Sequence, residues 1–149
     1  MSCDELTRLT LTNFVPPGTI KVAVEVDPLK GYYLAVCGEL QPDRSETHWK
    51  DVLIIPPHQT DRTYGDLIRR IGPVFLRPLN YDVLFAIKEQ YHLLNIGRIL
   101  ATGNLRKKEG CDGLFEIPML TELKEVIAVT LDPKLEVAPG TWVIAEQVV

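Results

Sequence analysis

The fold of this 149-residue chain is decided by residues 63–94, which read TYGDLIRRIGPVFLRPLNYDVLFAIKEQYHLL. Thr63, followed three residues later by Asp66, is a variant of the capping box that marks a helix start. Gly72-Pro73 is a strong helix stop. We therefore predict a first helix over about 64–71.

A second helix is predicted over about 81–94, with Asn80 as its cap. Asp82 falls in the first turn, where the helix dipole favours a negative charge. One apolar face recurs every three or four residues and consists of Leu84, Ile87, Tyr91 and Leu94. The amphipathic pattern predicts that this helix covers one face of a sheet.

Segments typical of β-strands lie on both sides of these helices. Their apolar residues alternate with polar ones or form short apolar runs bounded by Pro, Gly, Asp or Asn. The predicted strands are 5–14, 20–26, 32–40, 52–55, 96–102, 114–119, 125–131 and 141–148. We expect 20–40 to be a β-hairpin and 41–50 a polar loop. Grouped strands with helices between them predict an α+β fold with a mostly antiparallel sheet of about 7–8 strands. A barrel-like form of this sheet is an alternative.

Two short segments, Pro17-Gly18-Thr19 and Pro139-Gly140-Thr141, resemble each other, and each opens a predicted strand. We interpret the resemblance as shared turn chemistry rather than as a duplicated half-domain.

Length and composition favour one domain spanning residues 1–149. An apolar share of 46% and a net charge of −4 exclude a disordered chain. No window holds the ~20 apolar residues of a membrane span, and residues 1–8 lack the pattern of a signal peptide. Three widely spaced cysteines without a Cys-x-x-Cys pair suit a reducing compartment, so we expect a cytoplasmic protein that does not engage membranes.

The net charge hides an uneven distribution. Residues 1–60 hold 5 Lys and Arg against 8 Asp and Glu, residues 61–110 hold 9 against 5, and residues 111–149 hold 2 against 7. The candidate binding residues in this basic middle are Arg69, Arg70, Arg77, Arg98, Arg106, Lys107 and Lys108. If they converge, they form a patch for phosphate or for an acidic partner; scattered solvated charge is the alternative. We expect residues 106–108 at the tip of a hairpin.

His58, followed by Asp61 and Arg62, is the strongest candidate for acid–base chemistry. A His titrates near neutral pH, and a neighbouring carboxylate could orient its ring. The alternative is a surface loop whose Asp and Thr accept hydrogen bonds from the free N–H groups at the start of the following helix. The three histidines lack the short spacing typical of zinc ligands, and no cofactor motif is present, so we expect neither metal nor cofactor.

Trp49 stands in a polar stretch and is a candidate for an interface, with burial in the core as the alternative. The last strand would offer its backbone to another chain if it lay at a sheet edge. Together these features favour a non-catalytic binding or assembly module that acts through protein–protein contacts, as a homo-oligomer or as a subunit of a complex. A nucleic-acid or nucleotide binder using 62–108, and a small enzyme with acid–base chemistry at His58 and Asp61, are the two alternatives.

Overall fold

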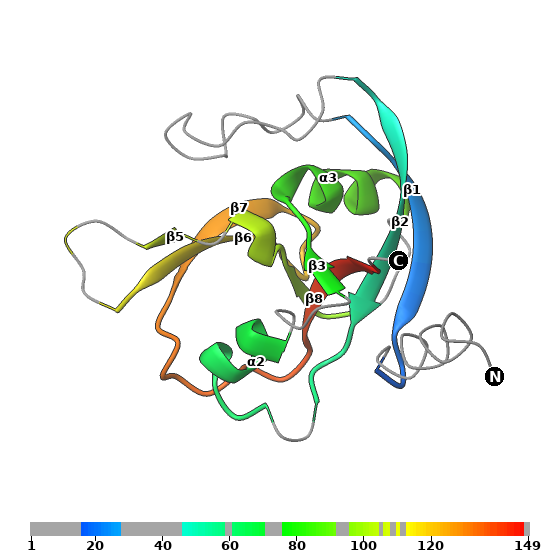
Figure 1. Cartoon of the computed structure of the whole chain (residues 1–149). Coiled ribbons are helices and arrows are strands. Elements are labelled where there is room, and N and C mark those ends of the chain that lie inside the picture. The colour runs from blue at the N-terminus through cyan, green and yellow to red at the C-terminus, as the bar shows by residue number, and fades with distance from the viewer. Residues whose placement is uncertain are drawn as a thin grey trace, which may run out of the picture.

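The chain forms one eight-stranded sheet with two α-helices in a computed structural model (Figure 1). The structure describes residues 16–27, 46–58, 61–70, 76–91, 96–104, 106–107, 110 and 113–147. The strands are β1 (Ile20–Val26), β2 (His48–Ile55), β3 (Leu76–Pro78), β4 (Arg98–Leu100), β5 (Arg106–Lys107), β6 (Phe115–Leu120), β7 (Val126–Leu131) and β8 (Thr141–Gln147). The helices are α2 (Tyr64–Arg70), α3 (Tyr81–Gln90) and the 3-10 helix η2 (Thr102–Asn104). The predicted α+β class is confirmed.

The sheet is mixed and open, which corrects the expected mostly antiparallel, barrel-like sheet. Its strand order is β1-β2-β8-β4-β6-β5, with β3 added to β8 and β7 to β6. β4 and β8 run parallel. At the start of β4, the N–H of Arg98 donates to the carbonyl of Gly140, the residue just before β8, at 2.9 Å. A Cβ at Gly97 would overlap that carbonyl, so the parallel pairing depends on a close backbone approach that the sequence pattern does not reveal.

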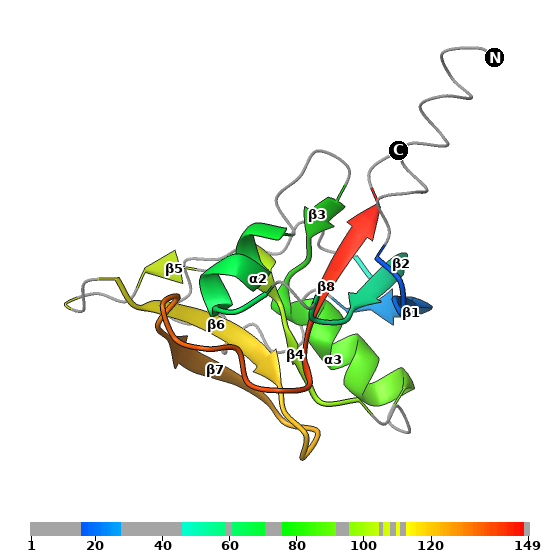
Figure 2. The same ribbon diagram turned by 90° about the horizontal axis from the view of Figure 1, so that it is seen from below.

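Two apolar clusters fill the two faces of the sheet, and α3 and α2 cover opposite faces (Figures 1 and 2). The larger cluster joins α3 to β1, β2, β4, β6, β7 and β8, so the sheet curves around this helix. The smaller cluster joins α2 to β2, β4, β6 and β8. Residues 52–55 of β2 are buried without alternation because both faces of that strand are covered.

The helix starts follow the sequence pattern only in part. The N–H of Asp66 donates to Thr63 Oγ1 and the N–H of Thr63 donates to Asp66 Oδ2, both at 3.2 Å, which confirms the reciprocal cap. Asn80 occupies the N-cap of α3 but makes no side-chain capping bond. α3 ends at Gln90, earlier than predicted, and residues 92–95 lie outside the described residues.

Neither described α-helix, with 7 and 10 residues, is long enough to cross a membrane.

The Pro-Gly-Thr segments make the same turn, as expected from shared chemistry. Gly18 and Gly140 have φ of +84° and +77°, values that favour glycine. The hydroxyl of Thr19 donates to the carbonyl of Pro16 at 2.6 Å, and that of Thr141 donates to Ala138 at 2.7 Å. Each turn thereby fixes the start of a strand.

Several predicted boundaries were wrong. β2 already begins at His48, inside the expected loop 41–50, and β3 lies between the two predicted helices, where we predicted no strand. Residues 106–107 form β5 opposite β6 instead of a hairpin tip. β1 pairs with β2, whereas the predicted strands 5–14 and 32–40 lie outside the described residues. β8 pairs on both sides, with β2 on one and with β4 and β3 on the other, and is therefore not an edge strand.

Candidate functional site

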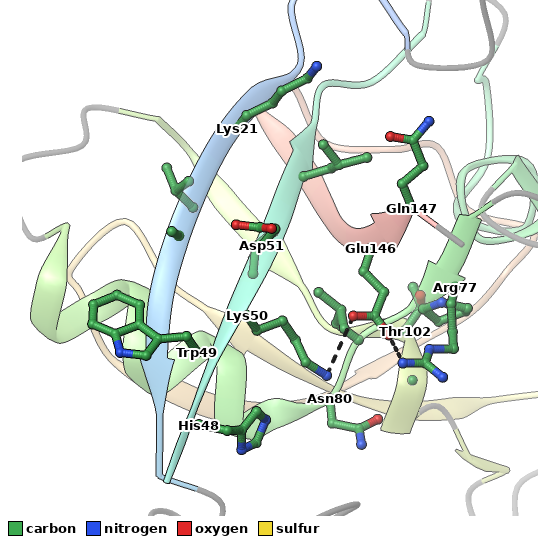
Figure 3. A pocket seen from close by; sticks show the side chains of 17 residues that line it. Lys21, His48, Trp49, Lys50, Asp51, Arg77, Asn80, Thr102, Glu146 and Gln147 are labelled. Carbon is green, nitrogen blue, oxygen red and sulfur yellow. Dashed lines mark ion pairs between the residues drawn. The ribbon is translucent and has the colours of Figure 1, made fainter. Parts of the chain in front are cut away.

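A cleft of about 1180 Å³ lies where β2 separates from β8 (Figure 3). The two strands pair only between Leu53–Ala145 and Ile55–Val143. Beyond this point β2 continues to His48 and β8 continues to Gln147 without pairing to each other. Residues of β1, β3 and η2 complete the walls, so the cleft is a wedge with its narrow end at Leu53.

The direction of the backbone groups in β2 follows from contacts on β1. The N–H and C=O of Glu25 bond the side-chain amide of Gln90, at 2.8 and 2.7 Å, and the carbonyl of Ala23 accepts from the Tyr91 hydroxyl at 2.8 Å. These odd-numbered residues of β1 therefore direct their backbone groups away from β2, and the even-numbered ones bond β2.

Trp49 and Asp51 are consequently the residues of β2 whose N–H and C=O point into the cleft. Each lies opposite an odd-numbered residue of β1, Glu25 or Ala23, in a pair without ladder hydrogen bonds. Among the described strands, none pairs with this part of the edge of β2. The cleft is thus lined by a short row of backbone donors and acceptors.

An ion-pair network crosses the cleft and joins three strands. Lys50 Nζ of β2 lies 3.6 Å from Glu146 Oε2 of β8, and Arg77 of β3 pairs with the other carboxylate oxygen. Figure 3 shows Lys50 and Arg77 reaching Glu146 from opposite sides. The side chains of Lys50 and Glu146 are only 16% and 15% exposed, whereas that of Arg77 is 63% exposed. The network therefore holds the two walls together while Arg77 still meets solvent.

Thr102 of η2 places a buried hydroxyl on the same wall. The residue is 8% exposed, and its Oγ1 makes no hydrogen bond within the part of the chain that the structure describes. The adjacent Gly103 donates its N–H to the carbonyl of Leu79 at 2.9 Å, which fixes η2 against the start of α3. An unbonded buried hydroxyl costs roughly 1–3 kcal/mol, and a ligand group could recover that cost.

Trp49 is 67% exposed and lies on β2 beside the cleft, so the alternative of burial in the core is wrong, and the interface role stays a prediction. In Figure 3 it points to the side of β2 opposite to Lys50. A large exposed aromatic side chain next to unpaired strand backbone is typical of a protein-binding surface.

His58 lies outside this cleft, exposed in the loop before α2. The carboxylate of Asp61 accepts the backbone N–H of His58 at 2.9 Å, and the N–H of Asp61 donates to the carbonyl of His58 at 2.9 Å. These bonds shape a turn. Nearby, hydrogen bonds from the Thr63 backbone and the Arg69 side chain hold the pKa of Asp66 below its usual value.

The basic candidate residues are distributed over several elements. Arg69 pairs with Asp66 at 2.8 Å on α2, and Arg98 Nε of β4 lies 3.1 Å from Glu122. Arg70 lies on α2 and Arg106 and Lys107 on β5, but their side chains are not described, and Lys108 lies outside the described residues. Of the nine candidate site residues, which are the seven basic residues together with Trp49 and His58, the cleft brings together Trp49 and Arg77.

Sequence reasoning missed Lys50, Glu146 and Thr102. Lys50 and Glu146 meet only because β2 and β8, far apart in sequence, are neighbours. One signal was available: Glu146 follows the apolar run Trp142–Ala145, and a carboxylate in such a strand needs a cationic partner. Thr102 carries no such signal.

Comparison with known proteins does not assign the site, because no family model, curated protein or solved structure matches the chain. The functional interpretation therefore rests on the geometry of the cleft.

Proposed function

We propose that the chain is a non-catalytic protein-binding module whose cleft takes an extended segment of a partner protein. The segment would add a strand to β2, bonding the backbone of Trp49 and Asp51 between β2 and the end of β8. The single observation that carries this proposal is the edge of β2 within the cleft, with which no strand of the described residues pairs. Strand addition of this kind is a common mode of peptide recognition, in which main-chain bonds give affinity and side-chain pockets give specificity.

The size and chemistry of the cleft favour a peptide over a small molecule. Its volume of about 1180 Å³ exceeds the roughly 300–1,000 Å³ of typical small-molecule pockets, which are mostly apolar. Its walls carry five charged side chains, those of Lys21, Lys50, Asp51, Arg77 and Glu146. A wall with this much polar surface suits a backbone that itself carries donors and acceptors.

The charges also indicate which segment would bind. Three basic side chains face two acidic ones, and Arg77 and Lys21 are both exposed. An acidic side chain in the segment could pair with these cations, while an apolar side chain could pack on Trp49. We therefore propose an extended segment that combines acidic and apolar residues.

Nucleic acid is less well supported as a ligand. Arg69 on α2 and Arg98 on β4 lie outside the cleft, and each pairs with a carboxylate, which lowers the positive potential that they offer to phosphate groups. We therefore rank a protein partner above nucleic acid.

Selection from a displayed library of random short peptides tests the proposal. We expect enriched peptides to contain acidic and apolar residues, and their affinity to fall about tenfold or more with Trp49→Ala and measurably with Arg77→Ala. Arg69→Ala is the matched control, because this arginine is paired and lies on α2 outside the cleft. Peptides that bind all these variants equally, or a library from which nothing is enriched, would contradict the proposal.

A further inference from the structure

The sheet itself closes one end of the cleft between β2 and β8. The two strands are paired from Leu53–Ala145 onward, so an extended segment that follows the edge of β2 past Asp51 meets two strands that already bond each other. Paired strands lie about 4.8 Å apart, which leaves no room for a third chain between them. A segment that bonds the backbone of Trp49 and Asp51 therefore cannot continue along the sheet beyond this narrow end.

The ion-pair network also closes the narrow end on the side of α3. Val52 and Ile144 belong to the cluster that packs on α3. Lys50 and Glu146 lie two residues before and after them in their strands, so their side chains share the same face. The 3.6 Å contact between Lys50 and Glu146 therefore crosses the α3 side of the cleft. An internal segment would have to bend sharply out of the opposite face, whereas a chain terminus needs no such bend.

We infer that the cleft takes the C-terminal segment of a partner protein, with the terminal carboxylate at the narrow end. The inference rests on the proposed function, because it names the part of a partner that the cleft accepts. Lys50 and Arg77 share the single carboxylate of Glu146, so the network carries two positive charges and one negative charge. An N-terminal ammonium group would meet a carboxylate that two cations already hold, whereas a C-terminal carboxylate would meet an excess of positive charge.

Arg77 has donors available for this carboxylate. Its side chain is 63% exposed, and within the described residues it pairs with Glu146 through one terminal nitrogen. A guanidinium group carries five N–H donors and can bind a second carboxylate through those that remain. Thr102, on η2 beside β3, adds a hydroxyl that makes no hydrogen bond in the described part of the chain (Figure 3). Asp51, the other acidic residue of the cleft, lies on the face of β2 opposite to Lys50 and is directed away from the network.

A carboxylate at the narrow end sets the direction of the bound segment. β2 runs from His48 at the open end of the cleft towards Leu53 at the narrow end. A segment whose C-terminus lies at the narrow end is therefore parallel to β2 and antiparallel to β8. Its preceding residues pass the exposed Trp49, on which an apolar side chain could pack.

Peptides with blocked ends test which terminus binds. The random library is displayed in two forms, one with free C-termini and one with free N-termini, and we expect enrichment in the first form. Isothermal titration then compares an enriched peptide as the free acid, as the C-terminal amide and with two glycines added after its last residue. The amide and the extended peptide should bind about tenfold or more weakly, because each removes the carboxylate from the narrow end. N-terminal acetylation should leave the affinity unchanged.

Substitution of Arg77 tests where the carboxylate binds. With Arg77→Ala the difference in affinity between acid and amide should shrink, whereas Arg69→Ala, outside the cleft, should preserve it. Circular dichroism checks the fold of both variants. If Arg77→Ala does not fold, a nitroxide label at the N-terminus of the peptide reports its direction on the parent chain. The label should broaden the amide signal of His48 more than that of Leu53.

The possible results separate this inference from strand addition itself. Equal affinity of acid and amide, loss of binding on N-terminal acetylation, an acid–amide difference that Arg77→Ala leaves unchanged, or stronger broadening at Leu53 would each overturn the inference while strand addition at β2 stands. If neither form of the library yields a peptide whose affinity falls with Trp49→Ala, the proposed function fails, and the inference fails with it.

Discussion

The contact between Lys50 and Glu146 should stabilise the protein measurably, and a double-mutant cycle determines by how much. The cycle compares the parent chain with Lys50→Met, Glu146→Gln and the combination of both. It isolates the interaction between the two groups from the separate effects of each substitution.

The expected magnitude follows from distance and burial. At 3.6 Å and an effective dielectric constant of about 20, the gross attraction is about 5 kcal/mol. Desolvation offsets most of it, because both side chains are more than four-fifths buried. Glu146→Gln should therefore lower the free energy of unfolding by about 1–3 kcal/mol, and the coupling energy should be about 1–2 kcal/mol.

Urea unfolding followed by tryptophan fluorescence measures each free energy. The exposed pair of Arg98 and Glu122 offers a matched control, because both side chains meet solvent and a cycle there should give about 0.5 kcal/mol or less. A coupling energy for Lys50 and Glu146 as small as that of the control would refute the claim that this network joins the cleft walls.

Three further substitutions have directions set by the structure. Gly97→Ala should destabilise the protein by about 2 kcal/mol or more, because its Cβ overlaps the Gly140 carbonyl, and an unchanged melting temperature would contradict the close approach of β4 and β8. Thr102→Val should leave the urea midpoint unchanged or raise it, since it replaces a buried unbonded hydroxyl; a clear fall would mean that the hydroxyl has a partner. Asp66 has a lowered pKa, so its contribution to stability is present above the unfolded-state pKa of about 3.9 and is lost as pH falls through the lower folded-state pKa. The difference in urea midpoint between the parent and Asp66→Asn should therefore shrink on going from neutral pH to about pH 3, and a difference independent of pH would contradict the assignment.

Local patterns in the sequence predict the elements whose cause is local. The reciprocal cap of Thr63 and Asp66 needs only a spacing of three residues, and the unbroken apolar run Val52–Ile55 predicts a short strand, which the structure buries on both faces. The short strand β3 could not be predicted in this way, because it ends at Pro78 and its segment resembles a loop between the helices. A proline is tolerated there because β3 has an edge position in the sheet.

Features that depend on distant segments could not be predicted. The parallel pairing of β4 with β8 requires Gly97 and Gly140 to approach closely, and neither glycine differs in sequence from one that simply ends an element. The cleft exists because pairing of β2 with β8 stops at Leu53, and no local pattern determines where two strands separate. The charged residues were visible as a basic region, but the pairing of Arg77 with Glu146 and of Arg98 with Glu122 follows only from the three-dimensional arrangement.

Residue-resolved amide hydrogen exchange, with and without a selected peptide, tests the central claim most directly. Strand addition at β2 predicts that the peptide slows exchange at Trp49 and Asp51, whose N–H groups point into the cleft. Exchange at Lys50 and Val52 should change little, because these amides already bond β1. Binding that leaves the amides of Trp49 and Asp51 unprotected, or that protects all four equally, would contradict the account.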